Sequence, residues 1–110
     1  MNITEIIGKY TSGEATLDET NAALKEAGSG LHLDPNKNKL TEEEIRATTI
    51  GTYPDQANGY GLLDTGTGSL DKVEVKNGEL TSCDCGSMYA LCVIAGRTYK
   101  VEGTKLVDYN

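Results

Sequence analysis

The sequence predicts a single α+β domain, in which short helices of the N-terminal half pack on an antiparallel sheet formed by the C-terminal half. Apolar residues recur with the period of a helix in the first half, and the period changes to two after residue 70. The length of 110 residues is that of one ordinary domain. We therefore expect one domain over 1–110, made of a helical hairpin (1–28), a middle segment (29–69) and a β meander of about four to six strands (70–110).

A complete apolar stripe predicts the first helix, over residues 3–11. Its members are spaced three and four residues apart, so they share one face of the helix. Asn2 can cap the start of this helix, and Ser12-Gly13 ends it, because glycine tolerates the left-handed conformation that follows many helices. We expect the stripe to cover the sheet of its own chain or, alternatively, a second chain. The stripe consists of Ile3, Ile6, Ile7 and Tyr10.

A capping box marks the start of the second helix. In this motif a Thr side chain and the Glu three residues later each bond the other's backbone N–H. Thr16 and Glu19 have this spacing, and they predict a helix over residues 17–27. The string Gly28-Ser29-Gly30 then ends the helix.

The third helix has the best-defined start in the chain. Thr41 and Glu44 form a second capping box, and Leu40 and Ile45 flank it as a hydrophobic staple. Acidic side chains in the first turn also suit the positive end of the helix dipole. This pattern predicts a helix over residues 42–50.

The remaining chain predicts a loop and then strands. Residues 51–69 are rich in Gly, Asp and Asn, and we expect an irregular segment there. Val73 and Val75 then alternate with charged residues, and Asn77-Gly78 is typical of a tight β-hairpin turn. Met88–Ala95 is apolar throughout, which predicts the central strand of the sheet.

The net charge of −7, from 10 basic and 17 acidic side chains, argues against several partners. A nucleic-acid-binding protein needs a basic surface for the phosphates, and an anionic membrane surface would repel this chain for the same reason. The first residues do not resemble a secretory signal, and the three cysteines are then most simply reduced thiols. We expect a cytoplasmic protein that binds no nucleic acid, no membrane and no cofactor.

The string Leu62-Leu63-Asp64-Thr65-Gly66-Thr67 resembles the active-site motif of aspartic proteases. In that chemistry two carboxylates share a proton, and one of them activates water. A chain of this length with one such motif resembles the dimeric retropepsin-like enzymes, and the resemblance implies a catalytic Asp64. An all-β fold would favour this alternative, whereas a helical N-terminal half would argue against it. Our first expectation is that Asp64 stabilises a turn and has no catalytic role.

The cysteines raise a second alternative, a small metal-binding domain. Cys83 and Cys85 would project from one face of a strand, and Cys92 could lie on the neighbouring strand. His32 is the only imidazole that could serve as a fourth ligand. A free cysteine also behaves as a small buried apolar residue, and we therefore expect no metal and a buried Cys92.

Two further resemblances bear on function. The pattern from Ile6-Ile7 and Tyr10 through Gly13-Glu14-Ala15-Thr16 to Glu19 and Leu24 resembles the helical hairpin of SHOCT-type modules, which implies a role in oligomerisation. The chain as a whole resembles small uncharacterised proteins encoded in prophages and mobile elements of Gram-positive gut bacteria. That resemblance implies an accessory or assembly role, and a place in the virion if the chain is of phage origin.

The leading functional hypothesis is a non-enzymatic interaction or assembly protein. Tyrosine offers a large contact area at a low entropic cost, so Tyr53 and Tyr60 could present an interaction surface from the 51–69 segment. The alternative is that this segment only covers the core. We expect a protein partner or self-association, and the candidate contact residues are Ile3, Ile6, Ile7, Tyr10, Tyr53 and Tyr60.

Overall fold

The computed structural model describes residues 2–64, 70–81 and 90–109, and it confirms the predicted α+β class with N-terminal helices. Three α-helices and one short 3-10 helix precede six strands in this part of the chain. The helices are α1 (Ile3–Thr11), α2 (Leu17–Glu26), α3 (Glu42–Ala47) and η1 (Pro54–Gln56). The strands are β1 (Gly59–Asp64), β2 (Leu70–Lys76), β3 (Glu79–Leu80), β4 (Leu91–Ile94), β5 (Arg97–Glu102) and β6 (Lys105–Asp108).

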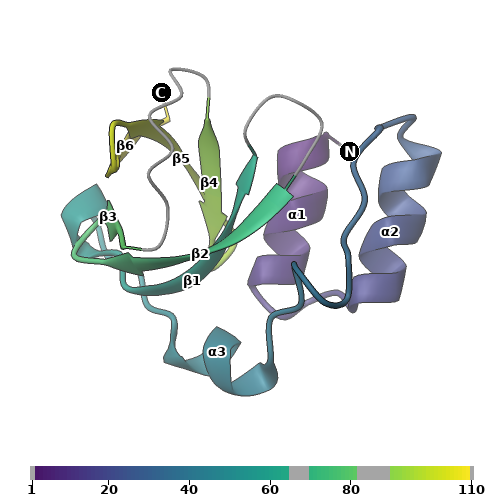
Figure 1. The fold of residues 1–110 in the computed structure, drawn as a ribbon, viewed down its shortest axis with the longest axis horizontal. Coiled ribbons are helices and arrows are strands. Elements are labelled where there is room, and N and C mark those ends of the chain that lie inside the picture. The colour runs from purple at the N-terminus through teal and green to yellow at the C-terminus, as the bar shows by residue number, and fades with distance from the viewer. Residues whose placement is uncertain (1, 65–69, 82–89, 110) are drawn as a thin grey trace.

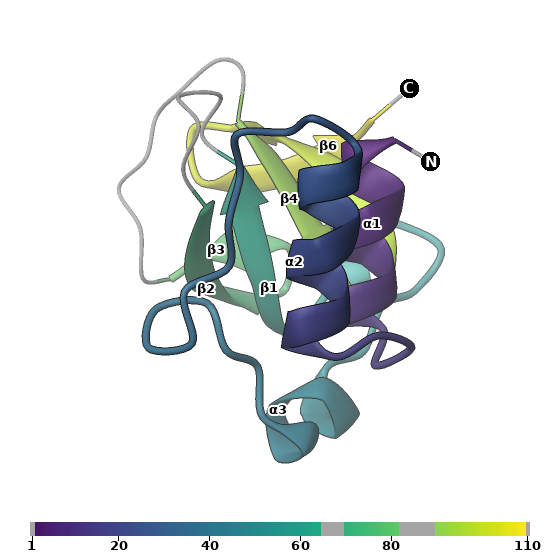
Figure 2. The ribbon, with the colours of Figure 1, turned by 90° about the vertical axis from the view of Figure 1, so that its right-hand side faces the viewer.

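The strands close into a small antiparallel barrel in the order β1-β2-β3-β6-β5-β4, and β4 returns to pair with β1. Helices α1 and α2 form an antiparallel pair, and α1 is the member that packs on the barrel, against β4, β1 and β5 (Figures 1 and 2). Helix α3 lies apart from that pair, at the lower end of the molecule in both views. The fold therefore has a helical layer on one wall of a barrel, with α3 at its lower edge.

Neighbouring residues of β1 and β4 face two different cores. Leu63 and Cys92 point into the barrel, whereas Leu62 and Val93 point outward and pack under the helical layer. All four are almost fully buried, as the alternation of side chains along a strand requires when both faces are covered. The sequence around β4 is therefore a continuous apolar run, because both faces of this strand are buried.

Glycine and threonine hold α1 close to the barrel. A Cβ atom on Gly8 would lie 3.3 Å from the carbonyl oxygen of Gly96, in the turn between β4 and β5. The Thr11 hydroxyl accepts the Gly96 N–H at 3.0 Å and donates to the Gly8 carbonyl at 3.1 Å. This close approach places the apolar stripe of α1 on the barrel wall.

The predicted hairpin turn forms at Asn77-Gly78, as expected. Asn77 and Gly78 both have positive φ, 51° and 75°, as the tight turn between β2 and β3 requires. Ala95 and Gly96 repeat this conformation between β4 and β5, with φ of 50° and 84°.

Four elements differ from the expected boundaries. Helix α2 ends at Glu26, one residue before the expected end, and β4 is Leu91–Ile94, within the run 88–95 expected to form the central strand. Helix α3 ends at Ala47 rather than at residue 50, because Thr48 is extended and Thr49 pairs with Asn58. Residues 59–64, expected within the irregular segment, form strand β1. The sheet is therefore a closed barrel that begins before residue 70.

None of the helices within the described ranges combines the length and the apolar character needed to cross a membrane.

Candidate interaction groove

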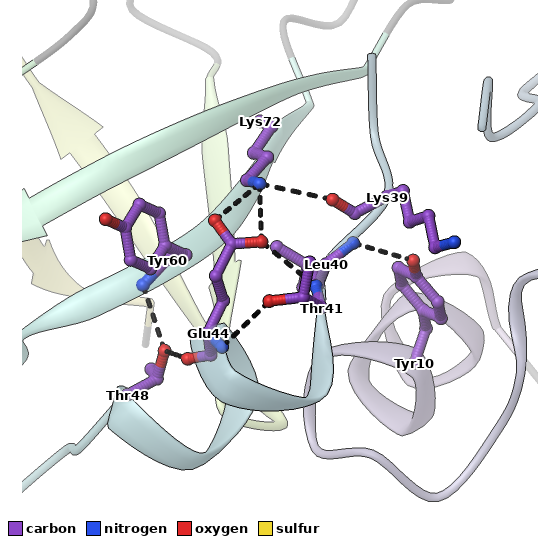
Figure 3. Close-up of polar contacts among 8 residues, drawn as sticks. All are labelled: Tyr10, Lys39, Leu40, Thr41, Glu44, Thr48, Tyr60 and Lys72. Atoms are coloured by element: carbon purple, nitrogen blue, oxygen red, sulfur yellow. Dashed lines mark hydrogen bonds and ion pairs between the residues drawn. The ribbon is translucent and has the colours of Figure 1, made fainter. Parts of the chain in front are cut away.

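Helix α3 has only six residues, so its position depends on contacts with the rest of the chain. The capping box forms as predicted: the Glu44 carboxylate accepts the Thr41 N–H at 2.9 Å, and the Thr41 hydroxyl accepts the Glu44 N–H at 3.1 Å. Lys72 of β2 binds the Glu44 carboxylate at 2.6 Å and the Lys39 carbonyl at 3.2 Å (Figure 3). A single lysine on the barrel therefore fixes both the helix and the segment before it.

Glu44 is half-buried and is ionised in this arrangement. Burial acts to raise the pKa of the Glu44 carboxyl, but the hydrogen bonds and charge of Lys72 and the N–H of Thr41 outweigh it. The pKa of Glu44 consequently lies below its ordinary value. The Lys72 ammonium also lies over the Tyr60 ring, 5.4 Å from its centroid.

The end of α3 and the segment before it have their own attachments. The Thr48 hydroxyl accepts the N–H of Tyr60 in β1 at 3.0 Å and donates to the Glu44 carbonyl at 2.7 Å. At the other end, the Tyr10 hydroxyl of α1 accepts the N–H of Leu40 at 2.9 Å (Figure 3). Helix α3 is thus tied to the barrel and to α1.

A mainly apolar groove of about 480 Å³ separates α3 from the turn that joins α1 and α2. Glycine in the left-handed conformation, Gly13 with φ of 86°, shapes that turn, and the Glu14 N–H bonds back to the Lys9 carbonyl at 2.8 Å. Leu17 and Ile45 are only partly buried and line the groove from its two sides. The full lining is Tyr10, Gly13, Glu14, Ala15, Thr16, Leu17, Lys39, Leu40, Glu42, Ile45 and Arg46.

The predicted stripe of α1 is used inside the chain. Ile6, Ile7 and Tyr10 are almost fully buried, and they pack with Leu62 and Val93 of the barrel wall. Ile3 is partly buried at the margin of the same cluster. Of the two expected alternatives, the sheet of the same chain or a second chain, the stripe covers the sheet of its own chain. Ile6 and Ile7 therefore offer no free contact surface in this fold.

The two candidate tyrosines lie on different parts of the barrel. Tyr53 is 64% exposed and lies beside β6, where it borders a shallow hollow with Pro54 and Val107. Tyr60 is partly buried between Lys72 and Glu74, and a hydrogen bond to Glu74 raises the pKa of the Tyr60 hydroxyl. The structure therefore does not bring Tyr53 and Tyr60 into one surface.

Asp64 is the last residue of β1, half-buried and opposite Leu70 of β2 and Leu91 of β4. Residues 65–67, which complete the protease-like string, lie outside the described residues. The N-terminal half is helical, which is the arrangement that argues against the retropepsin-like alternative.

Two of the possible metal ligands are separated in the fold. Cys92 lies inside the barrel, where burial raises the pKa of its thiol to about 12, whereas His32 is exposed in the loop after α2. Cys83 and Cys85 fall outside the described residues. Among the residues that the structure describes, no cluster of His, Cys, Asp and Glu could hold a metal ion.

Sequence reasoning identifies the components of the groove but not the groove itself. The local pattern indicates Leu40 and Ile45 as a hydrophobic staple and Thr16 as a helix cap. A further signal is that each of the two capped helices has an apolar residue in its first turn. This residue is Leu17 in one helix and Ile45 in the other. Their proximity depends on tertiary contacts, which the local pattern does not contain.

Comparison of this chain with protein-family models, with curated proteins and with solved structures gave no match.

Proposed function

We propose that this chain is a non-enzymatic interaction or assembly protein, which binds a polypeptide partner in the groove between the α1–α2 turn and α3. The observation that carries the proposal is the mainly apolar lining of a concave surface that the side chains of the described residues leave unfilled. Concave apolar surfaces with a few polar groups at the rim are typical of binding sites.

The rigidity of the groove wall supports the same function. The Lys72–Glu44 ion pair and the Tyr10–Leu40 hydrogen bond hold α3 at both sides of its start. A wall that is already in place costs little conformational entropy when a partner binds. Leu17 and Ile45 would then act as the apolar contacts of the site.

Peptide display tests this proposal while the partner is still unidentified. A random peptide library is selected on the purified chain, and the enriched peptides are measured by fluorescence anisotropy against groove variants. Ile45→Ala removes part of the apolar wall, and Ala15→Tyr fills the groove. Val107→Ala, on the outer face of β6, is the matched control.

We expect enriched peptides to lose about tenfold or more in affinity with either groove variant and to bind the control normally. Thermal melts of all variants must first show that each is folded. A selection that enriches no peptide, or peptides whose binding ignores both groove variants, would contradict the proposed function.

A further inference from the structure

Strand β6 has strands on both sides only near its start. It pairs with β5 along its whole length, from Lys105 to Asp108. On the other side its registered partner is Glu79 of β3, opposite Lys105. Beyond that pair, the edge from Leu106 to Asp108 has no second strand beside it among the described residues.

The backbone groups of this edge point away from β5. Successive residues of a strand direct their N–H and C=O groups to opposite neighbours, so residues two positions apart point the same way. The Leu106 N–H donates to the Gly78 carbonyl at 2.7 Å, on the side away from β5. The Leu106 C=O and both backbone groups of Asp108 therefore point outward as well. They make no hydrogen bond within the described residues, and unpaired groups of this kind are a template for another strand.

An open hollow of about 460 Å³ lies beside the edge, between β6 and η1. Its lining carries two carboxylates and no basic side chain. Asp55 makes no ion pair in the described part of the chain, and Asp108 lies 3.9 Å from Arg97 in an exposed pair that water screens strongly. The lining is Tyr53, Pro54, Asp55, Leu106, Val107 and Asp108, none of which lines the groove beside α3.

We propose that the edge from Leu106 to Asp108 is a second binding site, which takes up an extended, Lys- or Arg-bearing segment of a partner protein as a further strand of the sheet. Backbone hydrogen bonds supply the affinity in this mode of recognition, and alternate side chains supply the specificity. The exposed ring of Tyr53 and the partly buried Val107 offer apolar contacts. The cation of the segment lies against the carboxylates of the hollow.

Charge favours a different protein over a second copy of this chain as the occupant. A second copy would bring its own Asp55 and Asp108 against those of the first, and no basic residue of the lining would offset them. Each chain also carries a net charge of −7. Like charges that face each other across paired strands are destabilising.

A peptide titration followed by two-dimensional NMR tests this site. Capped heptapeptides in which Lys alternates with Val, Ile or Tyr are added to the isotope-labelled chain, up to about 2 mM. We expect saturable shift changes at Leu106, Asp108 and Tyr53 but not at Ile45, and slower hydrogen exchange of the Asp108 N–H. Peptides with Glu in place of Lys should bind about tenfold more weakly or not at all.

Two substitutions at one position separate the backbone contribution from the charge. Asp108→Ala removes the carboxylate and keeps the N–H, whereas Asp108→Pro removes both. Proline is tolerated where the N–H of an edge strand faces away from the sheet. We expect Asp108→Ala to weaken binding about threefold and Asp108→Pro to weaken it at least about tenfold further. Ile45→Ala, in the groove, is the matched control and should bind these peptides normally.

N-methylated peptides give a test that does not depend on the folding of a variant. Alternate amides are methylated in two complementary patterns. One pattern blocks the donors that face β6 and should abolish binding, and the other should preserve it.

Four outcomes would overturn the proposal. They are the absence of shift changes at the β6 edge with every peptide, equal binding of the Lys and Glu peptides, equal effects of Asp108→Ala and Asp108→Pro, and equal binding of the two methylation patterns. A doubled mass in light scattering, with concentration-dependent shifts at Leu106 and Asp108 in the absence of peptide, would make a second copy the occupant and overturn it too. None of these results bears on the groove beside α3, because the two sites share no lining residue.

Discussion

The hydroxyl of Tyr10 accepts the backbone N–H of Leu40, thirty residues away in the chain, at 2.9 Å. Both residues are buried, so this bond satisfies a backbone group that water does not reach. It also fixes the start of the α3 segment against α1, on one side of the groove.

Two tyrosines provide a matched test of buried hydroxyl groups. Tyr10→Phe leaves the Leu40 N–H without its acceptor, and we predict a loss of about 1–2 kcal/mol in the free energy of unfolding. The Tyr99 hydroxyl is buried in the barrel and has no hydrogen-bond partner among the described residues. Tyr99→Phe should therefore be neutral or stabilising, within about 1 kcal/mol, because it removes an unsatisfied polar group. Urea unfolding measures both, and a larger loss for Tyr99→Phe than for Tyr10→Phe would contradict the assignment.

The Lys72–Glu44 ion pair should affect stability in acid. Because the folded-state pKa of Glu44 is lowered, its contribution is present above the unfolded pKa and disappears as the pH falls through the folded value. We predict that Lys72→Met costs about 1 kcal/mol at pH 7 and that this difference shrinks below about pH 4. Thermal melts from pH 3 to 7 provide the measurement. A difference that stays constant over that range would show that the ion pair does not cause it.

Glycine in the α1–α2 turn should resist substitution. Gly13 has φ of 86°, a conformation that strains residues with a Cβ atom, and we predict that Gly13→Ala destabilises the fold by about 1 kcal/mol. Gly30→Ala is the control, since a Cβ there meets no atom within 4 Å and φ is not in the left-handed region. Its effect should lie within about 0.5 kcal/mol. Equal effects of the two substitutions on the urea midpoint would count against this explanation.

The Cys92 thiol should be unreactive in the folded protein. Burial raises its pKa to about 12, so almost no thiolate exists at neutral pH. We predict that iodoacetamide labels the Cys92 peptide only as fast as the chain opens, with a rate that increases steeply in urea. The raised pKa also makes stability depend on pH. The protonated, buried Cys92 thiol contributes fully to the free energy of unfolding below the pKa of the unfolded thiol, and stability falls as the pH rises beyond about 9. Rapid labelling without denaturant, detected by peptide mass spectrometry, would contradict the burial of this side chain.

Asp64 should be dispensable for chemistry. We predict that Asp64→Asn costs at most about 1–2 kcal/mol of stability, the scale of a lost capping interaction. Peptidase assays at acid pH provide the measurement. Activity that pepstatin blocks and Asp64→Asn abolishes would restore the aspartic protease hypothesis.

The local patterns predict the helices better than they predict the sheet. The capping boxes at Thr16 and Thr41 form because each needs residues only three positions apart. Strand β1 escapes prediction because its glycines have low strand propensity. In the fold, a Cβ on Gly61 would lie 2.7 Å from the Val93 carbonyl oxygen, so glycine is required by the close packing of β1 on β4. That requirement comes from a contact between segments that are distant in the sequence. The strand propensity of single residues contains no information about such a contact.

The groove could be predicted only in part for a related reason. The stripe on α1 correctly indicates an apolar docking face, and the structure uses it against the barrel. The contact between Lys72 and Glu44, which sets the groove wall, joins residues 28 positions apart that form no local motif. Pairs of this kind depend on the folded topology.

Among the strand pairings within 2–64, 70–81 and 90–109, the one that closes the barrel between β3 and β6 is the shortest. Strand β3 has two residues, and its registered pairing with β6 is Glu79 opposite Lys105. A break at this seam would leave an open sheet in the order β3-β2-β1-β4-β5-β6, with β3 and β6 as its two unpaired edges. Such edges can recruit the same strands from another copy of the chain, so the seam is the place where concentrated or heated protein would begin to exchange segments and polymerise.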